Sequence, residues 1–136
     1  MAANTSPVFT LTPNITVGQT VTTANTAKDG TGTVVTVHTA GANGSFVYSV
    51  VFQPIGTNTA SVGRIFLNNG SSNATPGNNS YVIDASLPAT TNSEVAGIGR
   101  TVVPINITVP AGYKLIVTIG TTVAAGFGVH CVAEDY

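Results

Sequence analysis

The stretch Ser45-Phe46-Val47-Tyr48-Ser49-Val50-Val51-Phe52 decides the fold class. Successive side chains of a β-strand point to opposite faces of a sheet. Strict alternation predicts one face made of Phe46, Tyr48, Val50 and Phe52. The opposite face then consists of Ser45, Val47, Ser49 and Val51. Because both predicted faces are partly apolar, we expect this strand to be central in its sheet.

The same period of two recurs on both sides of this stretch. Further strands are expected at residues 33–39, 64–67, 81–87, 101–109 and 113–119, and from residue 127 almost to Tyr136, with one or two more over residues 7–12 and 15–22. No apolar stripe of helical spacing persists for three turns, and good helix formers are scarce, so essentially no helix is expected. About eight short strands with turn residues between them predict an all-β, antiparallel β-sandwich with a jelly-roll-like topology.

Turn residues suggest how some strands are connected. The loop 40–44 (AGANG) predicts a hairpin between the strands at 33–39 and 45–52, because glycine and asparagine accept positive φ angles. The tight turn 110–112 (PAG) predicts a second antiparallel return, between 101–109 and 113–119. Pro104 has no amide hydrogen, so its strand is expected at a sheet edge or with a bulge.

Length and composition define the domain organisation. The 136 residues fit one domain, which we place at residues 14–136, preceded by an N-terminal arm of residues 1–13. A single cysteine excludes an internal disulfide, and a chain of this size can bury a sufficient core without staples. The first residues lack a secretory-signal pattern, and the apolar runs fall far short of the roughly 18 residues of a membrane span. We therefore expect synthesis in the cytoplasm.

Charge is unusually sparse. Four Lys and Arg residues oppose five Asp and Glu residues, which gives a net charge of −1 and charged residues at only 7% of the chain. No basic block is present to neutralise phosphates, so neither nucleic acid nor an anionic membrane is an expected partner.

The residues that could carry chemistry are few, and each has an ordinary structural interpretation. The candidates are Asp29, Asp84, Glu94, Glu134, Asp135, His38, His130 and Cys131. Asp29 sits in a predicted turn, Asp84 is expected to face solvent or a neighbouring arginine, and Glu134 and Asp135 form an acidic pair that is solvated or anchors to a partner subunit.

The two histidines lack metal-ligand spacing. His130 and its neighbour Cys131 should point to opposite faces of a strand, with Cys131 in the core. We predict no catalytic, cofactor-binding or metal site, and no enzymatic activity.

Several turn and strand motifs are similar to those of small proteins encoded among the structural genes of tailed bacteriophages and prophages. The similar segments are residues 28–34 (KDGTGTV), 39–44 (TAGANG), 56–60 (GTNTA), 64–70 (RIFLNNG), 109–115 (VPAGYKL), 118–121 (TIGT) and 124–126 (AAG). The resemblance spans about residues 27–136, leaves the N-terminal arm outside and implies no site residue.

The resemblance implies a virion structural protein made in the host cytoplasm, of the capsid decoration or cement type, that binds the major capsid protein. It also favours a homotrimer, with subunit contacts at Val47, Val51 or Val34, although these positions could equally lie inside a two-sided sheet stack. The arm at residues 1–13 is expected to order on the shell or on a neighbouring copy. The alternative is a tail, collar or fibre-associated module that binds a host-surface glycan.

Overall fold

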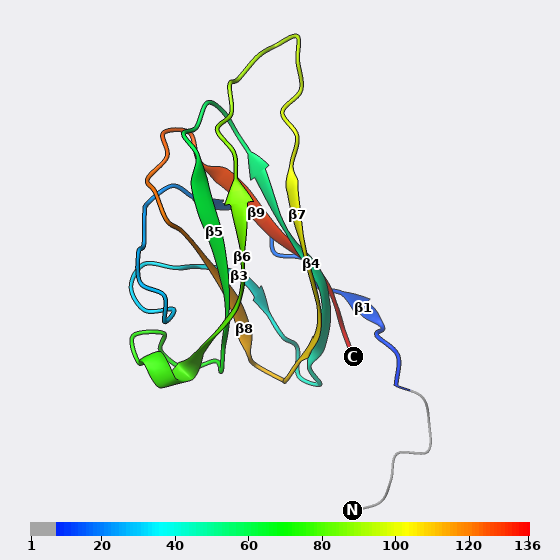
Figure 1. Ribbon diagram of the computed structural model, residues 1–136. Coiled ribbons are helices and arrows are strands. Elements are labelled where there is room, and N and C mark those ends of the chain that lie inside the picture. The colour runs from blue at the N-terminus through cyan, green and yellow to red at the C-terminus, as the bar shows by residue number, and fades with distance from the viewer. Residues whose placement is uncertain (1–7) are drawn as a thin grey trace, which may run out of the picture.

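Two antiparallel β-sheets face each other in the computed structural model, which describes residues 8–136 (Figure 1). Sheet A contains β1 (Thr12–Pro13), β2 (Gln19–Val21), β4 (Ser45–Pro54), β7 (Thr101–Val109) and β9 (Phe127–Asp135). Sheet B contains β3 (Val35–Thr39), β5 (Ser61–Asn68), β6 (Asn79–Leu87) and β8 (Lys114–Ile119). A short 3₁₀ turn, η1 (Pro76–Asn78), precedes β6. The all-β sandwich expected from the sequence is confirmed.

The strand order is that of a jelly roll. Sheet A runs β1-β9-β4-β7, with β2 also paired to β9, and sheet B runs β3-β8-β5-β6. The antiparallel pairs β2–β9, β3–β8, β4–β7 and β5–β6 nest inside one another along the chain. Successive nested pairs belong alternately to sheet A and sheet B, which is the strand arrangement of a jelly roll.

Both hairpins predicted from turn residues are wrong. Residues 40–44 connect β3 in sheet B to β4 in sheet A, and residues 110–112 connect β7 in sheet A to β8 in sheet B. The two connections lie side by side: the Ala40 amide donates to the Tyr113 carbonyl (2.8 Å), and the Gly112 amide donates to the Ala40 carbonyl (3.2 Å). The residues that permit a tight reversal here carry the chain from one sheet to the other.

A bulge in β4 breaks the strict alternation predicted for residues 45–52. The pairing registers of β4 with both β7 and β9 shift between Val47 and Ser49. Val47 therefore shares the core with Val50 and Phe52, whereas Tyr48 is 40% exposed. The prediction that Phe46, Tyr48, Val50 and Phe52 share one face is therefore wrong, because the extra residue of the bulge moves the side chains that follow it to the other face.

The bulge also bears on the positions considered for subunit contacts. Val47 is fully buried in the core, and Val51 is 2% exposed. Both side chains lie inside the folded chain, which agrees with the second interpretation of these positions, that they face the inside of a sheet stack and not a neighbouring subunit. Val34 is half-buried in the segment before β3.

The proline in β7 behaves as expected. β7 is the edge strand of sheet A, and its register against β4 shifts between Ile107 and Pro104. Asn106 lies in this irregular stretch with a φ of 52°. Prolines and bulges protect a sheet edge from pairing with another chain.

The N-terminal segment joins the sandwich at the end of the last strand. Thr12 pairs with Asp135 and Pro13 with Glu134, so the final residues of the expected arm form a short edge strand of sheet A. Residues 8–11 continue past this pairing, close to the C-terminus (Figure 1). Residues 1–7 of the expected arm lie outside the described residues.

In the described part of the chain, no helix has the length and apolar character needed to cross a membrane.

Candidate interaction surfaces

The ionisable residues singled out in the sequence are dispersed over the fold. Asp29 accepts hydrogen bonds from the Thr31 hydroxyl (2.6 Å) and amide (3.1 Å), which lower the pKa of its carboxyl group and confirm its role in a turn. Asp84 is exposed on β6, where it lies opposite Arg64 and accepts a hydrogen bond from the Tyr81 hydroxyl (3.1 Å). Glu94 is exposed in the β6–β7 loop. Within residues 8–136, no three His, Cys, Asp or Glu side chains are grouped as metal ligands would be.

The acidic pair at the end of β9 fastens the N-terminal segment. Asp135 accepts hydrogen bonds from the Asn14 amide group (2.9 and 3.0 Å), the Gly41 backbone amide (3.3 Å) and the Ser45 hydroxyl. Burial alone would raise the pKa of the Asp135 carboxyl group, but these hydrogen bonds outweigh it and lower the pKa. The expectation of a solvated pair is corrected for this residue.

Its neighbour Glu134 has the same function on the outer face of the sheet. Glu134 accepts hydrogen bonds from the Tyr48 hydroxyl (3.0 Å) and from the Thr10 hydroxyl. The hydrogen bond to Glu134 raises the pKa of the Tyr48 phenol. Together the two acids hold residues 10–14 against the end of β9.

Strict alternation predicts that His38 shares a face with Thr36. In the structure His38 lies in the core instead. A bulge between Thr36 and His38 places His38 opposite Leu115, and the side chain is fully buried. Neither ring nitrogen has a hydrogen-bond partner within the described chain. Burial lowers the pKa of the imidazole, and the nearby charge of Asp135 partly opposes this shift.

His38, Asp135 and Ser45 resemble a catalytic triad in residue type but not in geometry. A triad needs an exposed serine that donates to the histidine. Ser45 is fully buried and donates to Asp135 instead. His38 and Ser45 are buried and Asp135 is half-buried, and the three residues form a structural cluster.

His130 and Cys131 separate to opposite faces of β9, as expected. Cys131 is in the core, where burial raises the pKa of its thiol to about 12, so the reactive thiolate is scarce at neutral pH. His130 lines a groove on the outer face of sheet A.

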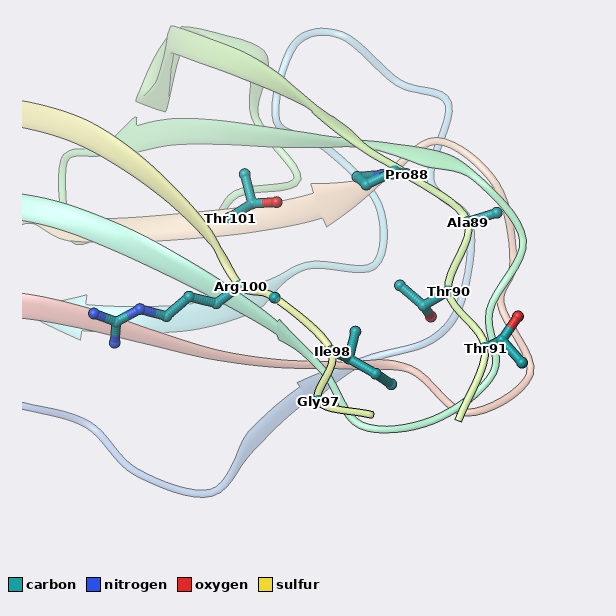
Figure 2. A pocket seen from close by; sticks show the side chains of 9 residues that line it. Pro88, Ala89, Thr90, Thr91, Gly97, Ile98, Arg100 and Thr101 are labelled. Carbon is teal, nitrogen blue, oxygen red and sulfur yellow. The ribbon is translucent and has the colours of Figure 1, made fainter. Parts of the chain in front are cut away.

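The long loop between β6 and β7 encloses a polar hollow at one end of the sandwich. The hollow has a volume of about 420 Å³ and is lined by two arms of this loop, residues 88–91 and 97–101. Figure 2 shows the Arg100 side chain extending away from Thr90 and Thr91 along the strands. No aromatic side chain lines the hollow, so it lacks the stacking platform that sugar rings commonly use.

Hydrogen bonds fasten this loop to the β4–β5 connection. The backbones of Asn58 and Thr90 exchange two hydrogen bonds (2.9 and 3.1 Å), and the Thr90 hydroxyl donates to the Gly56 carbonyl (2.8 Å). The buried Asn58 side chain accepts from the Gly126 amide (2.8 Å) and donates to the Gly126 carbonyl (2.9 Å). The loop is therefore held in place by its first residues.

One side of the sandwich exposes the edges of both sheets. β6 ends sheet B, β7 ends sheet A, and the β6–β7 loop joins them. Large apolar side chains are exposed along this side, which we call the open side: Tyr81 (43%), Ile83 (38%), Val95 (97%) and Val102 (47%). Unlike β7, β6 has no proline, and Asp84 is its only charged residue. An uncapped, partly apolar edge is a site where another chain can pair.

An apolar groove lies on the other side of sheet A, next to β2. It has a volume of about 540 Å³ and is lined mainly by residues 15–20, the end of β4 and the start of β9. Its exposed apolar side chains are Ile15, Val17 and Ile55, each more than half exposed. The sequence pattern does not predict this groove, although Ile15 and Val17 alternate there. Its lining comes from three distant segments that only the strand pairing brings together.

No protein-family model, no curated protein and no solved structure matches the chain.

Proposed function

We propose that the protein is a bacteriophage virion structural protein of the capsid decoration or cement type. It binds the major capsid protein through its open side and so stabilises the shell. The observation that carries the proposal is this open side, where the edges of both sheets are exposed and four large apolar side chains are exposed on β6, on β7 and in the loop that joins them, in a chain with few charges.

The composition supports dense packing of copies on a shell. With four basic and five acidic residues in 136, neighbouring copies repel one another weakly. A rigid sandwich loses little conformational entropy on binding, so its exposed apolar area contributes more fully to affinity. Binding to assembled shells but not to free subunits would stabilise the shell by mass action.

Quantitative mass spectrometry of purified particles tests the proposal. We expect a copy number comparable with that of the major shell protein. A few copies per particle would instead indicate a tail, collar or fibre location, and absence from purified particles would overturn the virion proposal.

A matched pair of variants tests the open side itself. Ile83→Lys places a charge on the β6 edge and should weaken binding to shells that lack the protein by at least about tenfold, because a lysine at an edge opposes strand pairing and desolvation. Ala124→Lys adds the same charge at an exposed position in the β8–β9 loop and should bind as the wild type does. Equal binding by both variants would show that the open side does not contact the shell.

A further inference from the structure

The N-terminal segment presents apolar side chains that nothing in the described chain covers. Val8 is 60% exposed, Phe9 is 70% exposed and Leu11 is 80% exposed. Thr10 between them donates its hydroxyl hydrogen to Glu134 and so faces its own molecule. Because side chains alternate along an extended segment, Phe9 and Leu11 point away from that molecule. Large apolar groups held outward in this way mark an interaction site.

The apolar groove has a matching character. Ile15, Val17 and Ile55 expose apolar surface there, and His130 is the only titratable side chain in its lining. Residues 8–13 (VFTLTP) also contain no charged side chain, so no charge has to be desolvated when the two surfaces meet.

The direction of the segment prevents it from continuing into its own groove. Thr12 pairs with Asp135 at the end of β9, and residues 8–11 run on beyond that end. The groove lies at the start of β9, around Gly128 and Val129. Six strand residues, about 20 Å, separate the two ends, and the segment would have to reverse to cover that distance.

We propose that residues 8–11 of one copy occupy the apolar groove of a second copy. Phe9 and Leu11 pack on Ile15, Val17 and Ile55 of the neighbour, within the groove. This exchange of N-terminal segments makes the protein a homo-oligomer in solution. This exchange does not depend on shell binding, because the N-terminal segment and the apolar groove both lie away from the open side.

Cysteine cross-linking with purified protein tests the exchange. Phe9→Cys and Ile55→Cys are prepared as separate variants, mixed, and oxidised mildly, with the buried Cys131 as an unreactive background. We expect a disulfide-linked pair of the two variants to form several-fold more than in a mixture of Phe9→Cys with Val95→Cys. Val95 is a suitable control because it is 97% exposed on the open side.

Sedimentation provides the second readout. The double variant Phe9→Ser/Leu11→Ser changes only exposed side chains, so its fold should be retained. Its sedimenting particle should have the mass of a monomer, whereas the wild-type particle should be larger. A wild-type protein that is already monomeric at tens of micromolar overturns the proposal. So does a cross-linking yield no higher than the control, or a Phe9→Cys/Ile55→Cys chain that closes mainly on itself on dilution.

Discussion

His38 is an imidazole enclosed in an apolar core without a hydrogen-bond partner in the described chain. The charged form of such a group is disfavoured, because burial removes its hydration. Asp135 is the charged residue close enough to oppose this effect, and its own oxygens are already engaged by Ser45, Asn14 and Gly41. His38 is therefore neutral in the folded protein near pH 7.

Stability should consequently fall on mild acidification. The folded pKa of His38 lies below the ordinary value of 6.5, so the unfolded chain binds more protons between these two values. The free energy of unfolding is highest above pH 6.5 and decreases as the pH falls through this window, by about 1.4 kcal/mol for each pH unit between the two pKa values. Urea unfolding from pH 8 to pH 5 measures this.

His38→Gln is the control for this prediction. It should be less stable than the wild type at pH 8, because a polar amide replaces the neutral ring in the core, but its stability should depend much less on pH over the same range. The same pH slope in both proteins would assign the effect to another group. A separate loss is expected below the ordinary Asp135 value of 3.8, where protonation breaks the hydrogen bonds that hold its pKa down.

At the scale of elements, the sequence predicts where strands and turns lie better than it predicts which strands pair. The strands expected around residues 45–52, 81–87 and 101–109 are all present. The loops at 40–44 and 110–112 have the residues of hairpins, yet both cross between sheets. Local turn chemistry specifies a change of direction, whereas the choice of sheet depends on contacts between distant segments.

Two glycines in these crossings separate the effects of backbone strain and steric contact. Gly44 has a φ of +89°, and a Cβ there would lie 2.7 Å from the Val109 carbonyl oxygen. Gly112 has a φ of +74° with open space around the Cβ position. Gly112→Ala should cost roughly 1–2 kcal/mol from the left-handed conformation alone, and Gly44→Ala about 1–3 kcal/mol more from the clash with the backbone.

Thermal and urea denaturation of both glycine variants give the comparison. Equal losses would show that the connection between β3 and β4 can move away from β7 at little cost.

At the scale of the whole molecule, the nested pairing makes the fold dependent on distant contacts. Gln19 pairs with Val129 and Thr12 with Asp135, so the strands nearest the two ends of the chain must meet before sheet A is complete. Such topologies pay the entropy of closing long loops before they gain contacts. The nesting also explains why the groove, built from three segments, was not predictable from the sequence.

Refolding should therefore take milliseconds to seconds, the range typical of all-β domains. Stopped-flow dilution from urea, followed by tyrosine fluorescence because the chain has four tyrosines and no tryptophan, measures the rate. A main phase completed in microseconds would contradict the dependence on distant pairs.

Neutral asparagine side chains make several of the hydrogen bonds that fasten the loops flanking sheet B. Asn25 donates to the carbonyls of Thr31 and Thr33, Asn73 donates to those of Gly30 and Gly32, and Asn79 to that of Asp29. Dissolved ions weaken interactions between charges, but they have little effect on hydrogen bonds between neutral amides. These amide hydrogen bonds should hold the loops equally well in dilute buffer and in concentrated brine.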